Sequence, residues 1–402
     1  MLSYEQAIEK LLAAARPVAE IRHVPLNAAT GRVLAAAVQS TISVPPSAMS
    51  AMDGYAVRAA DIPAVGTELK VSQRIPAGAS PEPLAAGTAA RIFTGAPIPE
   101  GADTVVMQEV TTAGEGSVVF NELPRAGAFI RPIGEDFLAG ADLLAAGIRL
   151  RPQDVALAAA AGIPQLPVFR RVRVGVFFTG DELVQPGEPL PPGAIYNSNR
   201  YALFALLEAL GCEVRDLGAV PDDFDLTRDA LRRAAADNDL VVTSGGVSVG
   251  EEDHVKPAVE AEGQLQMWKL AAKPGKPLAF GTVRRAEGGE SWFIGLPGHP
   301  VSSIVTFMIF VRPFVLSLQG IADVLPRGIM LPADYDWPKA DVRREFLRAR
   351  LNEQGRVELF PNQGPGVLSS LCWAGGLVDN RPSQPVKRGE LVRYIPFTEL
   401  LA

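Results

Sequence analysis

The 402-residue sequence contains few of the residues that hold metal ions or form disulfides. It has two cysteines, Cys212 and Cys372, which lie far apart, and three histidines, His23, His254 and His299. This number and spacing argue against a structural zinc site. Sparse cysteines of this kind are typical of a protein from a reducing compartment.

A membrane segment, a signal peptide and an excess of positive charge are also missing. The most apolar run, 304–311, is too short to span a bilayer. Near the N-terminus, apolar residues recur at helical spacing and Glu5 and Glu9 interrupt them, unlike a signal peptide. The net charge of −7 argues against a nucleic-acid-binding surface. We therefore expect a soluble, cytoplasmic protein that binds neither membranes nor nucleic acids.

Two common catalytic motifs are absent as well. The segment KPGKP at 273–277 lacks the serine or threonine of a Walker-type phosphate loop, and no serine and histidine are paired as a nucleophile and its base. What remains is an ordinary globular composition, with 48% apolar and 21% charged residues. A chain of this length exceeds a single hydrophobic core, so we expect several domains.

The stretch 239–277 carries the most chemistry. A short apolar run, Leu240–Thr243, predicts a buried parallel strand, and the glycines after it let backbone N–H groups face an anion. Carboxylates and then lysines follow on the same stretch. In order, the polar and glycine positions are Gly245, Gly246, Ser248, Glu251, Glu252, Asp253, Lys269, Lys273 and Lys276. Together they suit a phosphate-bearing ligand with a divalent cation. The alternative is an ordinary strand–turn–helix beside a solvated lysine loop.

Alternating strands and helices from about 171 to 320 predict a mostly parallel sheet. Three of its strands end in acidic loops, at 181–182, 222–223 and 251–253, and a fourth ends in the glycine–proline turn 295–300. Ligands of such sheets bind beyond the carboxyl ends of the strands. Converging carboxylates repel one another unless a cation lies among them, so this pattern predicts a Mg²⁺-assisted site.

The flanking regions predict other domain types. Two short helices are expected within 3–37, the second opening near Asn27, and a buried helix over 150–163. Short strands between turns indicate a β-rich domain up to about 140 and an all-β module from 332 to 401. Arg343 and Ser369 in that module suit an oxyanion, although a solvated strand face is the simpler interpretation. Asp53 alone is explained by a tight turn before a strand.

Several contiguous motifs resemble the MoeA family of molybdopterin molybdenumtransferases, which includes the C-terminal domain of gephyrin. They occur in family order over nearly the whole chain: PPSAMSAMDGYAV, TGAPIPEGADTVVMQE, RPIGEDF, FTGDEL, TSGGVSVGEEDHV, WKLAAKPGKPLAFG and GLPGHPVSS. The final module matches less strongly, through REFLRA and the loop before Leu371. Chance agreement over motifs of this length is very improbable.

The resemblance implies a multidomain α/β plus β fold with a central MogA-like parallel α/β domain. The four expected domains are a discontinuous helical linker (1–42 and 141–170), a β-rich insert (43–140), a molybdopterin-binding α/β domain (171–320) and a C-terminal β-barrel (321–402). It also implies a homodimer, with the molybdopterin adenylyltransferase of the same pathway as a candidate partner.

The activity implied by the resemblance converts adenylylated molybdopterin and molybdate into molybdenum cofactor and AMP, with Mg²⁺ required. The catalytic positions carried over are Asp53, Glu182, Asp222 and Asp253, the last three as metal ligands. The substrate-binding positions are Thr94, Gly245, Gly246, Ser248, Lys269, Lys273, Lys276, Pro297, Pro300, Arg343 and Ser369. His299 departs from the asparagine usual in the PGNP turn of the family.

Two other functions remain as alternatives. A molybdopterin adenylyltransferase resembles the 171–320 domain alone, and the additional domains argue against it. A gephyrin-like scaffold has no reason to keep acids and lysines together. Asp53 lies outside the α/β domain, and we expect it to reach the site from the partner subunit.

Overall fold

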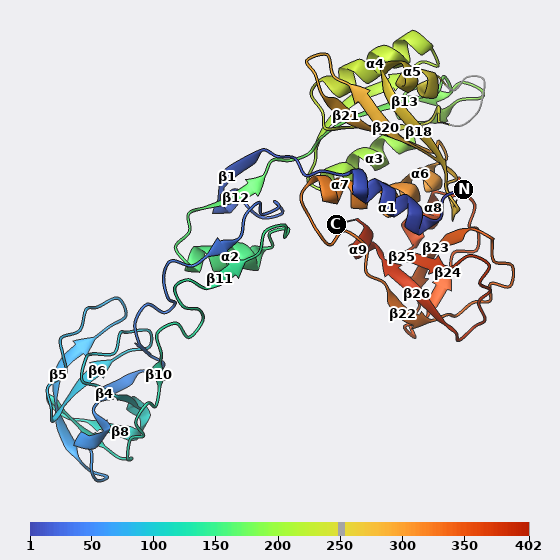
Figure 1. The fold of residues 1–402 in the computed structure, drawn as a ribbon. Coiled ribbons are helices and arrows are strands. Elements are labelled where there is room, and N and C mark those ends of the chain that lie inside the picture. Colours follow the sequence, from blue (N-terminus) through green and yellow to red (C-terminus); the bar gives the residue numbers. More distant parts are fainter. Residues whose placement is uncertain (248–253, 402) are drawn as a thin grey trace.

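The structure, a computed structural model, describes residues 1–247 and 254–401 and has an elongated shape (Figure 1). An α/β domain and a C-terminal β domain lie side by side at one end. A narrow linker connects them to a β-rich lobe at the other end. The chain passes through the linker twice, because the lobe is inserted between two linker segments.

The α/β domain is built on a six-stranded sheet in the order β16-β13-β17-β21-β20-β18. The first four strands in this order are parallel to one another. β20 runs antiparallel to its two neighbours, β21 and β18, so the sheet is mostly parallel, as expected. The strands are β13 (Arg173–Thr179), β16 (Glu213–Val220), β17 (Leu240–Ser244), β18 (Gly263–Lys269), β20 (Pro277–Arg284) and β21 (Glu290–Leu296). A separate parallel pair joins β14 (Leu183–Val184) and β15 (Ile195–Tyr196).

Helices cover both faces of this sheet, so its central strands are buried on both sides. One face packs against α4 (Phe224–Ala236) and α5 (Val255–Glu262), and the other against α3 (Ser198–Ala209), α6 (Pro300–Thr306) and α7 (Arg312–Leu318). The first helix, α1 (Tyr4–Ala14), begins with a Ser3–Gln6 capping box and buries Ala7, Ile8 and Leu11 in the same core as α7. α1 therefore packs with the α/β domain and not within the linker.

The apolar helical segment at the end of this domain is longer than the sequence analysis supposed. A π-helical turn (Phe307–Val311) joins α6 to α7, and the combined Pro300–Leu318 segment has 19 residues. By length and composition alone this segment could cross a membrane, whereas the run 304–311 by itself is too short. However, 89% of this window is buried inside the structure, as in the core helix of a soluble protein.

The linker contains less helix than predicted. β1 (Ile21–Pro25) pairs with β12 (Gln165–Phe169), and β2 (Val38–Gln39) pairs with β11 (Asp142–Leu144). The helix expected near Asn27 is wrong: that segment forms a single 3₁₀ turn, Leu26–Ala28, directly after β1. The partner of β1 lies far away in the sequence, so local capping signals could not reveal it.

The remaining linker helix, α2 (Pro152–Ala160), forms where predicted, but it is not buried as its composition suggested. Among its residues Asp154 and Ala158 are buried, and several of its alanines face solvent. The Arg151–Asp154 pair caps its first turn. Alanine favours helices without needing a packing partner, which explains a stable helix with an exposed side.

The distal lobe has a six-stranded sheet in the order β7-β4-β6-β5-β9-β8, as expected of the β-rich domain. β4 buries Tyr55 and Val57 in one apolar cluster and Ala56 in another, on the opposite face of the strand. The strands are β4 (Gly54–Val57), β5 (Glu68–Ile75), β6 (Thr88–Ile92), β7 (Thr104–Met107), β8 (Thr111–Ala113) and β9 (Ser117–Phe120), beside the pair β3 (Met49–Ser50) and β10 (Ile130–Arg131).

The C-terminal module forms a closed β structure, as expected of a small barrel. Its sheet runs β19-β23-β25-β26-β22, β24 pairs with β23, and a parallel bridge between Ala333 and Val357 closes the ring. The elements are β19 (Ala272–Lys273), β22 (Ile329–Pro332), β23 (Arg344–Leu351), β24 (Val357–Leu359), β25 (Gly376–Asn380), β26 (Leu391–Pro396), α8 (Ser369–Trp373) and α9 (Phe397–Leu400).

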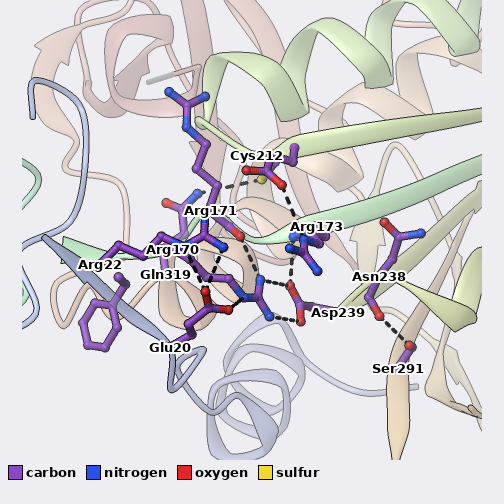
Figure 2. A network of polar contacts seen from close by, with 12 residues as sticks. Glu20, Arg22, Arg170, Arg171, Arg173, Cys212, Asn238, Asp239, Ser291 and Gln319 are labelled. Carbon is purple, nitrogen blue, oxygen red and sulfur yellow. Dashed lines mark hydrogen bonds and ion pairs between the residues drawn. The ribbon is translucent and has the colours of Figure 1, made fainter. Parts of the chain in front are cut away.

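A buried ion pair joins the linker to the α/β sheet (Figure 2). Arg170, directly after β12, donates two hydrogen bonds of 2.7 Å to the two carboxylate oxygens of Asp239, which precedes β17. The backbone N–H of Arg173 donates to the same carboxylate at 2.9 Å, and Glu20 contacts Arg170 at 3.0 Å. Burial alone would raise the pKa of Asp239, but these hydrogen bonds overcome it and hold the pKa below its usual value.

Replacing this carboxylate should destabilise the α/β domain. We expect Asp239→Asn to lower the free energy of unfolding by about 2 kcal/mol, because Arg170 loses its two charge-assisted hydrogen bonds and keeps only the half-exposed Glu20 as a carboxylate partner. Asp239 has a depressed pKa in the folded state, so its contribution is present above its unfolded pKa and is lost as pH falls through the folded value. The wild-type–variant difference should therefore be constant near pH 7 and shrink below about pH 4.

The measurement is urea unfolding followed by the fluorescence of Trp268 and Trp292, which belong to this domain. Asp225→Asn is the matched control, because its exposed pair with Arg228 should contribute at most about 1 kcal/mol. Equal effects of the two substitutions would contradict the assigned role of the buried pair.

Candidate functional site

A cavity of about 560 Å³ lies at the carboxyl ends of the parallel strands, where the α/β domain meets the C-terminal barrel. Loops that follow β13, β16, β17 and β21 all contribute to its lining. Parallel strands place their carboxyl ends at one edge of the sheet, which is why loops far apart in sequence meet there.

The acidic side of the cavity is formed by Glu182, from the loop after β13, and Asp222, from the loop after β16. These strands are neighbours, and backbone hydrogen bonds lock their loops together. The Asp181 N–H donates to Asp222 Oδ2 at 3.2 Å, and the Asp222 N–H donates to Asp181 Oδ1 at 3.1 Å. The predicted convergence of these two acidic loops is therefore confirmed.

Burial and crowding by the neighbouring acids raise the pKa of Asp222. Burial raises the pKa of Asp222, and the charges of Asp181 and Glu182 raise it further. A cation beside the group would oppose both effects. Among the described residues no group of three or more histidines, cysteines, aspartates and glutamates could hold a metal ion by itself. The third predicted acid, Asp253, lies outside the described residues.

Glycines after β17 form another wall of the cavity. Gly245 has a φ of +101°, and a Cβ there would lie 2.6 Å from the Thr179 carbonyl oxygen, so a side chain cannot be accommodated. Ser244 fixes the neighbouring loop, because its hydroxyl donates to the Pro297 carbonyl at 3.0 Å. Gly245, Gly246 and Pro297 thus line the cavity through close backbone packing.

The lysine loop crosses from the α/β domain to the barrel. Ala272 and Lys273 form β19, which pairs in parallel with β23 of the barrel. The loop then closes through a 2.7 Å hydrogen bond from the Leu270 N–H to the Lys276 carbonyl. Gly275, with a φ of +95°, packs so closely against α6 that a Cβ would meet Thr306 at 2.3 Å. Both domains therefore fix the positions of Lys273 and Lys276.

Three cationic residues, Lys273, Lys276 and Arg343, line the same cavity as the acids. Lys276 is exposed, and its ammonium makes no hydrogen bond or ion pair with any described residue. Lys273 lies 3.5 Å from the buried Glu345 and 3.6 Å from Asp341. Arg343 donates two hydrogen bonds, of 3.0 and 2.8 Å, to the carboxylate of Asp341. Of the three, Lys276 is the most available to an anionic ligand.

Sequence reasoning missed the barrel loop that completes this wall. Gln363 and Pro365 line the cavity, and the Pro365 carbonyl accepts a 3.0 Å hydrogen bond from the Val301 N–H of α6. Arg348, 1% exposed, supports the loop through Gly364 and Ser370, and burial lowers its pKa to about 10. No motif indicated this support. Ser369 begins α8 after this loop, but it is exposed and does not line the cavity.

A second cavity of about 330 Å³ adjoins the first and shares Glu182 and His299 with it. Asn199 Nδ2 donates to the Gly298 carbonyl at 2.7 Å, which leaves its Oδ1 buried without a partner. Asn197 Oδ1 caps α3, which leaves its Nδ2 buried without a partner. Unsatisfied buried polar atoms are uncommon. Here a donor and an acceptor stand beside the cavity, below its surface.

Two predicted residues lie in the distal lobe instead. Thr94 donates to one carboxylate oxygen of Asp53 through its N–H and its hydroxyl, both at 2.8 Å. These hydrogen bonds, and more weakly the charge of Arg91, lower the pKa of Asp53. The carboxylate is thus held ionised with its other oxygen uncommitted by Thr94. Within one chain this lobe lies at the far end from the cavity (Figure 1).

Comparison with known protein families covers almost the whole chain. Residues 2–162 match the MoeA N-terminal region (domain I and II), 175–317 match a probable molybdopterin binding domain, and 331–397 match the MoeA C-terminal region (domain IV). The chain belongs to the MoeA family.

Individual MoeA relatives agree over full length. The molybdopterin molybdenumtransferase of Haemophilus influenzae is 40% identical over 100% of both chains, and molybdopterin molybdenumtransferase 2 of Mycobacterium tuberculosis is 38% identical over 94% of both. The crystal structure of the molybdopterin biosynthesis MoeA protein from Pyrococcus horikoshii superimposes with a TM-score of 0.84 at 29% identity, covering 98% of this chain and 100% of that one. The predicted MoeA resemblance and multidomain fold are therefore confirmed.

The other residues predicted from the MoeA resemblance lie in different places relative to the two cavities. Pro300 lines the second cavity, and Lys269, at the end of β18, is exposed and lines neither cavity. Ser248, like Asp253, lies outside the described residues. His299 is exposed in both cavities and its side chain does not cap α6, so its imidazole faces ligand space in this MoeA chain.

Proposed function

We propose that this MoeA-family chain is a molybdopterin molybdenumtransferase that converts adenylylated molybdopterin and molybdate into molybdenum cofactor and AMP. The observation that carries the proposal is one cavity with opposed charges. Glu182 and Asp222 line it from loops that follow strands of the α/β sheet, and Lys273, Lys276 and Arg343 line it from the lysine loop and the barrel. A reaction that joins an oxyanion to a substrate bearing a phosphoanhydride needs both kinds of group.

The basic side suits molybdate, a dianion with a phosphate-like shape. Lys276 offers an uncommitted ammonium, and Lys273 offers a second one whose charge is shared with Glu345 and Asp341. Arg343 is already bidentate with Asp341, so we assign it to orienting this wall more than to direct contact. The Gly245 N–H already donates to the Leu296 carbonyl at 3.2 Å, so this glycine contributes space to the cavity and not a donor.

The acidic side suits Mg²⁺. Carboxylate oxygens are its preferred ligands. Burial and the neighbouring acids raise the pKa of Asp222, and a cation bound beside it would favour its ionised form. Glu182 and Asp222 would hold the ion, and Asp253 would join them in the mechanism implied by the family resemblance. When bound, the cation supplies neutralisation of charge on the phosphate oxygens as the phosphoanhydride is cleaved.

The second cavity suits the heterocyclic part of the substrate. Its lining combines apolar Leu183 and Ile195 with the polar ends of Asn197 and Asn199. A flat heterocycle has an apolar face and an edge of donors and acceptors, which matches this combination. A small displacement of the lining would expose the unsatisfied donor and acceptor to it.

Asp53 and Thr94 enter the proposal only in a homodimer. Two hydrogen bonds from Thr94 fix the carboxylate of Asp53. However, the lobe that carries both residues is remote from the cavity of its own chain. We propose that the lobe of one protomer completes the cavity of its partner. The reaction uses pathway intermediates made in the cell interior, so we also propose a cytoplasmic location.

The deciding experiment measures AMP release from adenylylated molybdopterin, with molybdate and Mg²⁺ each added or withheld. We expect release to require both, and Asp222→Asn to remove the Mg²⁺ response while leaving the fold intact by circular dichroism. Tungstate in place of molybdate tests the selectivity of the basic wall.

The alternative function is distinguished in the same assay. An adenylyltransferase would consume ATP with metal-free molybdopterin and would form the adenylylated compound instead of cleaving it. ATP consumption without molybdate-dependent AMP release would reject the proposed function.

A further inference from the structure

A smaller cavity of about 180 Å³ lies at the junction between the linker and the α/β domain, away from the sites described above. Linker residues Arg32 and Arg149 line it together with Arg170 and Arg171, which lead into β13. The end of α3 and Gln319, just after α7, form the opposite side. Four arginines around one small cavity are unusual in a protein whose net charge is −7.

The four arginines differ in how their charges are balanced. Arg170 is neutralised by Asp239, to which it is bidentate. None of the other three has an ion pair with a described carboxylate. Arg32 donates to the Phe169 carbonyl at 2.9 Å, and Arg149 donates to Gln319 at 2.8 Å and to the Leu210 carbonyl at 3.1 Å. These acceptors satisfy N–H groups without supplying a full negative charge.

Arg171 is the least committed of the group. Its guanidinium makes no hydrogen bond or ion pair with a described residue, and Figure 2 shows its side chain projecting away from Asp239. Burial lowers the pKa of Arg32, and repulsion from Arg171 and Arg22 lowers it further. Burial also lowers the pKa of Arg149. All three remain cations at neutral pH, held together at an electrostatic cost.

Nearby negative charge compensates only part of this cluster. Among the described lining residues Glu208 is the one carboxylate. The backbone carbonyls at the end of α3 are the other source of negative charge. A helix C-terminus contributes about half a negative charge, and Arg149 already uses it by bonding Leu210. Glu213 also attracts Arg32, but it is shared with Arg173, which it contacts at 3.4 Å. Positive charge is therefore left over beside a cavity large enough for several atoms.

We propose that this cavity binds a phosphate-class oxyanion, held by Arg32, Arg149 and Arg171. Guanidinium groups are well suited to such an anion because their planar donors match its oxygens. Arg32 and Arg149 belong to the linker, whereas Gln319 belongs to the α/β domain. Occupancy therefore fixes the angle at which the linker leaves that domain, and with it the position of the distal lobe.

The experiment is phosphate titration by isothermal calorimetry on the full chain carrying Lys276→Ala, which removes the most available cation of the main cavity. Sodium chloride at equal ionic strength controls for screening. We expect saturable phosphate binding that Arg171→Gln weakens about tenfold, the loss of one charge-assisted contact. Since Arg171 makes no side-chain bond to a described residue and repels Arg32, its replacement should not lower the unfolding temperature measured without phosphate.

Arg215→Gln is the matched control, because that arginine is exposed and pairs with Asp237 outside the cavity. Pyrophosphate and AMP are titrated in parallel: tighter pyrophosphate binding identifies a diphosphate as the preferred occupant, and tighter AMP binding identifies the phosphate group of a nucleotide. Amide hydrogen exchange around Arg32 and Arg149 should slow on binding. Absence of saturable binding, or equal binding by the Arg171 and Arg215 variants, would overturn the proposal.

Discussion

Lys276→Ala is expected to lower molybdate-dependent AMP release by about 100-fold or more. The ammonium of Lys276 lines the main cavity and has no partner among the described residues, so its charge is available to a bound oxyanion. Removing a preorganised donor to developing or bound negative charge typically costs two to three orders of magnitude, about 3–4 kcal/mol. The measurement is the initial rate at varied molybdate concentration.

Two further variants sharpen this result. Lys256→Ala, on the exposed side of α5, controls for the loss of any lysine. Lys269→Ala tests a residue that the family resemblance predicts as substrate-binding but that lines neither cavity. Dimerisation is measured alongside by analytical ultracentrifugation. If Lys276→Ala impairs dimerisation as strongly as molybdate use, the lysine has a structural role and the assignment is wrong.

The second large effect is complementation between inactive subunits. Asp53→Ala and Asp222→Ala homodimers should each be inactive, because each lacks one carboxylate at every site. If one site combines Asp53 of one protomer with Asp222 of its partner, a mixed dimer has one site with both defects and one intact site. Random reassociation should then restore about a quarter of the wild-type activity.

A site contained within one chain predicts a different outcome. Every chain in the mixture carries one substitution, so no intact site could form and activity would stay absent. Mixing Asp222→Ala with Glu182→Ala provides the control, because both residues line the same cavity of one chain.

 In the Asp222→Ala and Glu182→Ala mixture each chain carries a defect in its own cavity, so no intact cavity exists and activity should stay absent. Recovery in the Asp53 mixture alone supports the shared site, and absence of recovery in both mixtures, once subunit exchange has been shown, contradicts it.

Much of the α/β domain could be predicted because its signals are local. The run Leu240–Thr243 forms a buried strand as expected, and Asn197 caps α3. Acidic loops after neighbouring parallel strands were expected to meet, and hydrogen bonds between Asp181 and Asp222 join them. Topology turns such local patterns into a site, which is why this part of the prediction succeeded.

The failures have a common physical cause, since they depend on partners distant in sequence. β1 forms because residues 165–169 pair with it, and bridges from Val33 to Arg149 and from Leu34 to Val168 take the place of the helix expected to open near Asn27. The support of the cavity by Gln363 and the buried Arg348 depends likewise on how the barrel packs against α6. No local pattern encodes contacts of this kind.

The strand β19 has a consequence for how such a protein can be divided. Its two residues, Ala272 and Lys273, leave the α/β domain and complete the edge of the barrel sheet. If a flexible tether alone attached the barrel, the lysines would have no fixed position relative to it. Because β19 pairs with β23, the segment that carries Lys273 is fixed to both modules. The two modules are therefore a single functional unit, although each has its own core.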